Sequence, residues 1–89
     1  NLIMDINQLI EIVKKKINSN IQVDELQVLD KTFLHSKHLS HEHGKFHLKI
    51  IIKSEEIKFK NRIEVSRNIH KILEKEIKEF IHSLQIELI

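Results

Sequence analysis

The apolar residues of this chain switch between two spacings, and the order of the switches limits the folds that it can adopt. Over 6–17 they recur every three or four positions, which is typical of one face of a helix. Over 25–33 and 45–53 they alternate singly, which predicts two strands. Helical spacing returns from about 62 to 81, and single alternation returns over 83–89. The sequence therefore predicts the order helix, strand, strand, helix, strand.

This order favours an α+β domain with a three-stranded mixed sheet and both helices packed on one face. The long second helix lets the third strand return parallel to the second by a right-handed crossover. We expect one domain spanning 1–89, in which 1–4 are an extension or a disordered end. Asp5 stands where it can cap the first helix. The charged residues of the long helix are expected to face solvent.

The composition argues against several classes of protein. There is no cysteine, so neither a disulfide nor a thiolate-bound metal can stabilise the domain. The 15 Lys and Arg residues are nearly balanced by 13 Asp and Glu residues, which argues against a strongly basic phosphate-binding surface. No apolar run approaches the roughly 20 residues of a membrane span, and the first residues lack the features of a signal peptide. We therefore expect a cytoplasmic protein.

The residues that catalysis requires do not form a recognisable pattern. One glycine cannot build a glycine-rich phosphate loop, and no serine stands in a G-x-S-x-G motif. The carboxylates are dispersed among lysines, as on a solvated surface. We therefore expect a protein without enzymatic activity.

Histidines gather in the connection between the first two predicted strands, which we expect to be a flexible loop over 34–45. Five of the seven histidines lie in or beside it, at His35, His38, His41, His43 and His47. Imidazole binds transition metals through one ring nitrogen, but these spacings match no fixed zinc motif. Three interpretations stay open: a polar loop, a metal or cluster site, and a pH switch in which charged imidazoles repel one another.

The remaining histidines lie on predicted regular elements, as does His47. We expect His47 to be half exposed on the polar face of the second strand. His70 is offset by one residue from the apolar stripe of the long helix, where it lines the edge of the stripe or faces a partner. We expect His82 at the end of that helix, where a protonated imidazole complements the helix dipole or the ring simply caps carbonyl groups.

Four segments, in this order, resemble the BolA family: "LQVLDKTFLH", "FHLKIIIKSEEIKFKNR", "NRIEVSRNIHKILEKEI" and "IHSLQI". They are similar to the first strand and loop entry, the second strand and its connection, the long helix, and the closing segment of the family. The resemblance runs from about Ile6 to Leu88. It implies an α+β fold similar to the type II K-homology fold, in agreement with the predicted order of elements.

The resemblance also implies an accessory role. BolA proteins partner with monothiol glutaredoxins and can share a [2Fe–2S] cluster with them, which implies a part in cluster handling or iron-status signalling, and a monomer when alone. One cluster or metal ligand is implied in the loop, at His35 with His38 as a near substitute. The second is implied at Ser66, where the family has a histidine. His70 lies one helical turn later, about 6 Å away, and is the candidate replacement.

BolA proteins are also described as DNA-binding transcriptional regulators, which gives an alternative function. The basic residues for that role are Lys58, Lys60, Arg62, Arg67 and Lys71, near the start of the long helix. The G-x-x-G loop with which K-homology domains clamp nucleotide backbones is absent from the sequence.

Overall fold

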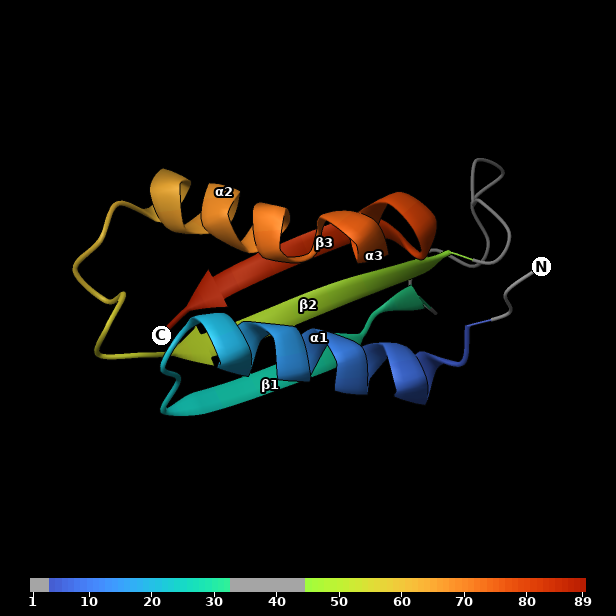
Figure 1. Cartoon of the computed structure of the whole chain (residues 1–89), viewed down its shortest axis with the longest axis horizontal. Helices are drawn as coiled ribbons and strands as arrows, with labels where there is room; N and C mark the ends of the chain where they lie inside the picture. The colour runs from blue at the N-terminus through green and yellow to red at the C-terminus, as the bar shows by residue number, and fades with distance from the viewer. Residues whose placement is uncertain (1–3, 33–44) are drawn as a thin grey trace.

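The computed structural model describes residues 4–32 and 45–89. Its elements come in the order α1 (Ile6–Asn20), β1 (Glu25–Asp30), β2 (Phe46–Lys53), α2 (Arg62–Ile72), α3 (Glu74–Glu79) and β3 (Ile81–Leu88) (Figure 1). The predicted order is confirmed, although the second helix is divided in two. The predicted loop over 34–45 lies outside the described residues except for its last residue. In the described ranges no helix combines the length and apolar character that a membrane span needs.

β2 is the central strand of a three-stranded sheet, between β1 and β3. β1 pairs with β2 antiparallel, so that Val28 lies opposite Ile50. β3 pairs with β2 parallel, so that Ile86 lies opposite Ile50 on the other side. Parallel strands need a crossover connection, and α2 with α3 supplies it. The predicted mixed sheet is therefore confirmed.

The core lies between one face of this sheet and the helices, which pack on that same face as predicted (Figure 1). The residues that form its centre are at most 3% exposed: Leu9, Val13 and Ile17 of α1, Leu48, Ile50 and Ile52 of β2, and Val65 and Ile69 of α2. Burial of each such side chain contributes about 1.5–3 kcal/mol before the loss of conformational entropy is counted. Alternate residues of β2 supply the sheet side of the core because they point to the same face.

The long helix predicted over 62–81 ends earlier and is interrupted. Leu73, with φ −102° and ψ 18°, separates α2 from α3, and β3 already begins at Ile81. Phe80 is buried between α3 and β3 rather than on a helix. Its position in the helical spacing was misleading, because a short apolar pair at the end of a helix also fits the start of a buried strand. As a consequence His82 lies in β3 and not at a helix end, which corrects the prediction.

The ends of the elements differ from the predictions in detail. Asp5 occupies the N-cap position of α1, but its side chain makes no capping hydrogen bond. The cap of α2 is made by Asn61, whose side-chain oxygen accepts hydrogen bonds from the backbone N–H groups of Ile63 and Glu64. β1 ends at Asp30 rather than at residue 33.

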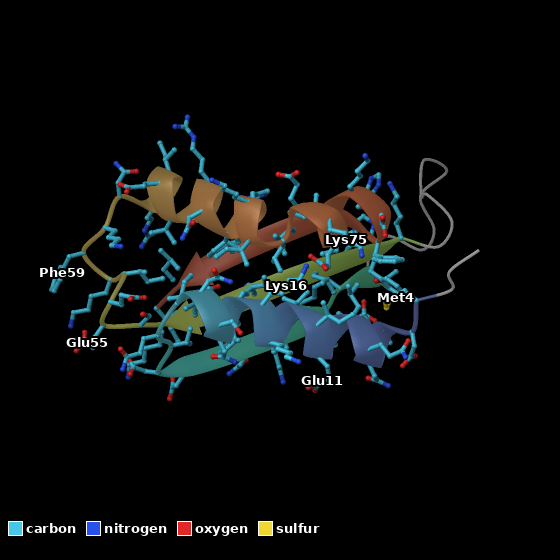
Figure 2. All side chains as sticks on the ribbon, viewed as in Figure 1. Met4, Glu11, Lys16, Glu55, Phe59 and Lys75 are labelled. Atoms are coloured by element: carbon cyan, nitrogen blue, oxygen red, sulfur yellow. The ribbon has the colours of Figure 1, made fainter. Side chains whose placement is uncertain are left out.

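Glu76 on α3 differs from the expectation that the charged residues of the long helix face solvent. It is 4% exposed, and its Oε2 atom accepts a hydrogen bond from Lys16 Nζ at 2.6 Å. Figure 2 shows Lys16 on the side of α1 that faces α3. Among the described residues, Glu76 Oε1 has no hydrogen-bond partner. A buried carboxylate is costly unless it is paired, and Lys16 offsets this cost for Glu76. The ion pair also joins α1 to α3.

We expect Lys16→Met to lower the free energy of unfolding by about 2 kcal/mol, because it leaves the buried Glu76 carboxylate without its cation. Glu76→Gln removes the ion pair and the buried charge together, so it should lower the free energy of unfolding by about 1 kcal/mol or less. The double variant Lys16→Met with Glu76→Gln should be more stable than Lys16→Met alone, because it leaves no unpaired buried charge. Urea unfolding followed by circular dichroism measures these differences. Lys15→Met, at an exposed position of the same helix, is the matched control. Equal effects of Lys15→Met and Lys16→Met would contradict a stabilising pair.

Candidate functional site

β1 ends and β2 begins at the same end of the sheet, and β3 begins there too because it runs parallel to β2. The Lys31 backbone N–H donates to the carbonyl oxygen of His47 at 2.7 Å. The His47 N–H donates to Thr32 Oγ1 at 3.2 Å. Residues 33–44, which carry four histidines, therefore join the sheet at this end.

His47 is buried rather than half exposed, which corrects the prediction. It is 5% exposed, and a hydrogen bond of 2.6 Å joins its Nδ1 atom to Ser83 Oγ. At this point the pairing of β2 with β3 is irregular: Phe46 lies opposite Ile81, but His47 lies opposite Ser83. One residue of β3, His82, is therefore extra at this point, as in a β-bulge.

The extra residue brings a second imidazole to the same end of the sheet. The rings of His47 and His82 have centroids 5.0 Å apart and meet edge to face, at 60°. His82 is exposed, whereas His47 is buried. We call these two residues the histidine pair. The sequence patterns did not predict this contact, because they assigned the two residues to a strand and to a helix end.

His35 and His38, the predicted loop ligands, lie outside the described residues. In the sequence, His35 follows Thr32 by three positions. Thr32 is in direct contact with His47. The histidine pair therefore lies at the end of the sheet where residue 33 follows Thr32.

Ser66 and His70 lie one turn apart on α2, as predicted. His70 Nδ1 donates to the carbonyl oxygen of Ser66 at 2.8 Å. A carbonyl oxygen can only accept, so the neutral ring carries its proton on Nδ1 and has the lone pair on Nε2. A backbone carbonyl orients metal-binding histidines in the same way. His70 is exposed, so its ring is accessible and could serve as a metal ligand.

The position of α2 nevertheless separates these two residues from the end of the sheet that carries the loop. That end is marked by Phe80, whose carbonyl oxygen accepts from the Phe46 N–H at 2.8 Å. At 1.5 Å per helical residue, His70 lies about 15 Å and Ser66 about 20 Å from Phe80 along α2 and α3. Of the described imidazoles, those of the histidine pair thus lie at the end of the sheet where residue 33 follows Thr32, whereas that of His70 lies away from it.

The described part of the chain contains no group of three or more side chains that could hold a metal ion alone. A cluster shared between two proteins needs only part of its ligands from each. Imidazole is an accepted ligand of [2Fe–2S] clusters, as in Rieske centres, whereas a serine hydroxyl is a poor one. The histidines therefore fit such a shared group, and Ser66 does not.

The basic residues near the start of α2 do not all share one face. Lys58 pairs with Glu55 at 2.7 Å. Arg67 and Lys71 are one turn apart and exposed. Arg62 and Lys71 are nine residues apart, which at 100° per residue places them on opposite sides of the helix. At most part of the predicted DNA-binding set can contact one surface at a time.

Comparison of the structure with known structures identifies the fold. The BolA domain of SufE1 from Arabidopsis thaliana superposes with a TM-score of 0.77 at 24% identity, covering 96% of this chain and 92% of that one. BolA1 from Arabidopsis thaliana superposes with a TM-score of 0.74 at 19% identity, covering 90% and 88%. The solution structure of BolA1 from Mus musculus superposes with a TM-score of 0.71 at 15% identity, covering 89% and 62%.

The sequence comparisons add the family. No curated protein matches the sequence. The model of the BolA-like protein family, however, matches residues 17–89, which include every described strand and the crossover helices. This match covers most of the chain, and it agrees with the superpositions. The chain therefore belongs to the BolA-like protein family.

Proposed function

We propose that this chain is an accessory protein that binds a monothiol glutaredoxin and takes part in iron–sulfur cluster handling or iron-status signalling. Membership of the BolA-like family supports the choice of partner. The observation that carries the proposal is the histidine pair, which stands at the end of the sheet where the histidine-bearing residues 33–44 join it. The role is one of binding and not of catalysis.

The ligands that we propose for a shared [2Fe–2S] cluster are one histidine from residues 33–44 and one from the sheet. His35 is the first candidate and His38 the second. From the sheet, exposed His82 is preferred to His47, which is buried and bonded to Ser83. His70, oriented by the Ser66 carbonyl, is the alternative second ligand on α2. The bound cluster would supply the redox-active iron centre, and the chain would supply imidazole nitrogens and the protein surface around them.

Visible circular dichroism tests the proposal, because its bands report the ligands and geometry of the cluster. We expect addition of this protein to a cluster-loaded monothiol glutaredoxin to change the spectrum from that of the glutaredoxin alone. His82→Ala should abolish the change, whereas His70→Ala, a matched loss of an exposed imidazole, should leave it intact. Far-ultraviolet spectra and thermal unfolding check that both variants fold.

The other outcomes separate the parts of the proposal. A spectrum that the wild-type protein leaves unchanged would contradict cluster sharing, and calorimetry with the cluster-free glutaredoxin would then decide whether the partner binds at all. Loss of the change in His70→Ala but not in His82→Ala would move the second ligand to α2. In that case Ser66→His should strengthen the change, because it adds an imidazole beside His70.

A DNA-binding regulator is the second candidate, favoured by the exposed cations Arg67 and Lys71 on one side of α2. Each phosphate contact contributes about −0.9 to the slope of log K against log salt concentration. Two contacts give a slope of about −2, whereas five cations acting on one surface would give about −4.5. We expect titrations with duplex DNA, followed by amide chemical shifts at several low salt concentrations, to give the shallow slope. A slope steeper than about −4 would mean that all five cations contact DNA at once, and would contradict their division between different sides of α2.

A further inference from the structure

A groove of about 530 Å³ runs between α2 and the second half of β3. Both elements lie at the side of the sheet away from β1 (Figure 1). Its lining comes from the first half of α2, from the second half of β3 and from one residue of β2: Arg62, Ile63, Val65, Ser66 and Arg67, the residues from Leu84 to Leu88, and Lys49. It lies far along α2 from the histidine pair, so it is a separate surface, and its role is independent of the proposed function.

The floor of the groove is apolar and only partly covered. Leu84 and Ile86 of β3 lie opposite Leu48 and Ile50 of β2 in the parallel register, on the same face of the sheet. The β2 side chains are at most 1% exposed, whereas the β3 side chains are half-buried. Ile63, on the α2 side, is 64% exposed. The helix therefore leaves apolar surface uncovered beside β3.

The backbone of β3 also has a free edge at the groove. β3 has β2 as its only neighbour in the described sheet. The Ile89 N–H donates to the Ile52 carbonyl at 2.9 Å, so odd-numbered residues of this segment bond to β2. The N–H and C=O groups of the intervening residues, Leu84, Ile86 and Leu88, consequently point away from β2. An extended chain laid along this edge could pair with them.

The charges at the groove favour an acidic occupant. Glu87 is the one carboxylate among the lining residues, and Lys49 pairs with it at 2.9 Å. Arg62 and Arg67 are exposed, and neither forms a salt bridge with any residue in the described ranges. The guanidinium group is suited to carboxylates, which it binds with two parallel hydrogen bonds. The first N–H groups of α2 are already capped by Asn61, so the arginines are the source of the attraction.

We propose that this groove binds an extended acidic peptide segment of a partner protein. The segment adds to β3 as a fourth strand, bonds to the backbone of Leu84, Ile86 and Leu88, and places carboxylates against Arg62 and Arg67. A nucleic acid would use the arginines but would leave both the strand edge and the apolar floor without a partner. A second copy of this chain, paired through β3, would bring the same arginines toward one another.

The test uses a nine-residue peptide that alternates glutamate with valine and is blocked at both ends. Such a peptide can present its carboxylates to either face of the new strand by a shift of one residue. Amide chemical shifts of the whole protein are followed up to millimolar peptide. We expect the largest shifts at Leu84, Ile86 and Leu88, with slowed exchange of these amide protons, because they gain hydrogen bonds.

Variants and probe peptides separate the contributions. Arg62→Gln with Arg67→Gln should weaken binding about tenfold, since two exposed charge-assisted contacts are lost. Lys15→Gln with Lys75→Gln removes the same charge from exposed positions outside the groove and should leave the affinity within about twofold of wild type. The same peptide with alternate backbone nitrogens methylated should bind at least tenfold more weakly, because it cannot pair as a strand.

Several results would overturn the proposal. They are the absence of shifts at millimolar acidic peptide, equal binding of a lysine–valine peptide, and equal binding of the methylated peptide. Tighter binding of a single-stranded oligonucleotide that gives the same pattern of shifts would reassign the groove to nucleic acid. Shifts in β3 that depend on protein concentration without any peptide would reassign it to a contact between copies of this chain.

Discussion

The parallel pairing of β2 with β3 is the interaction on which the rest of this structure depends. It requires a crossover, which α2 and α3 provide, and it leaves β3 at the edge of the described sheet. Its irregularity, between Phe46 and His47, makes His82 extra and sets its ring against that of His47. Both surfaces to which we assign a binding role therefore result from how one strand lies beside its neighbour.

The crossover also explains why the two surfaces are separate. β3 begins at the end of the sheet where residues 33–44 join it, and it ends beside the start of α2. The histidine pair lies at the first end, and the groove with its arginines lies at the second. A small domain can thus contact two partners without the partners competing for the same residues. The ion pair between partly exposed Lys16 and buried Glu76 joins α1 to α3 between these ends.

Much of the fold was predictable because each element carries a regular spacing of apolar residues. The alternation of Leu48, Ile50 and Ile52 identified β2. The parallel pairing of β3 with β2, which sets Leu84 and Ile86 opposite Leu48 and Ile50, follows from the predicted mixed sheet. The predictions that were wrong depended on contacts between elements. Phe80 fits a helical stripe as well as a strand start, so the end of the long helix was placed too late. The pairing irregularity at Phe46 has no local signature, so the position of His47 opposite Ser83 and its contact with His82 were not foreseen.

The candidate site was predictable only in part for the same reason. The closeness of Ser66 and His70 is a consequence of helical periodicity alone, and the hydrogen bond between them confirms it. The distance of both from the end of β1 depends on the direction in which α2 runs over the sheet. The family resemblance directed attention to Ser66, whereas the arrangement of strands directs it to His82, which stands beside His47.

Our central claim is that the sheet, and not α2, supplies the second imidazole of a shared cluster. Ring signals of ¹⁵N-labelled histidines in this protein, recorded with a cluster-loaded monothiol glutaredoxin, test it most directly, because the paramagnetic iron broadens the signals of nearby nuclei. We expect the ring signals of His82 to disappear while those of His70 stay sharp. Loss of the His70 signals with the His82 signals unchanged would contradict the claim.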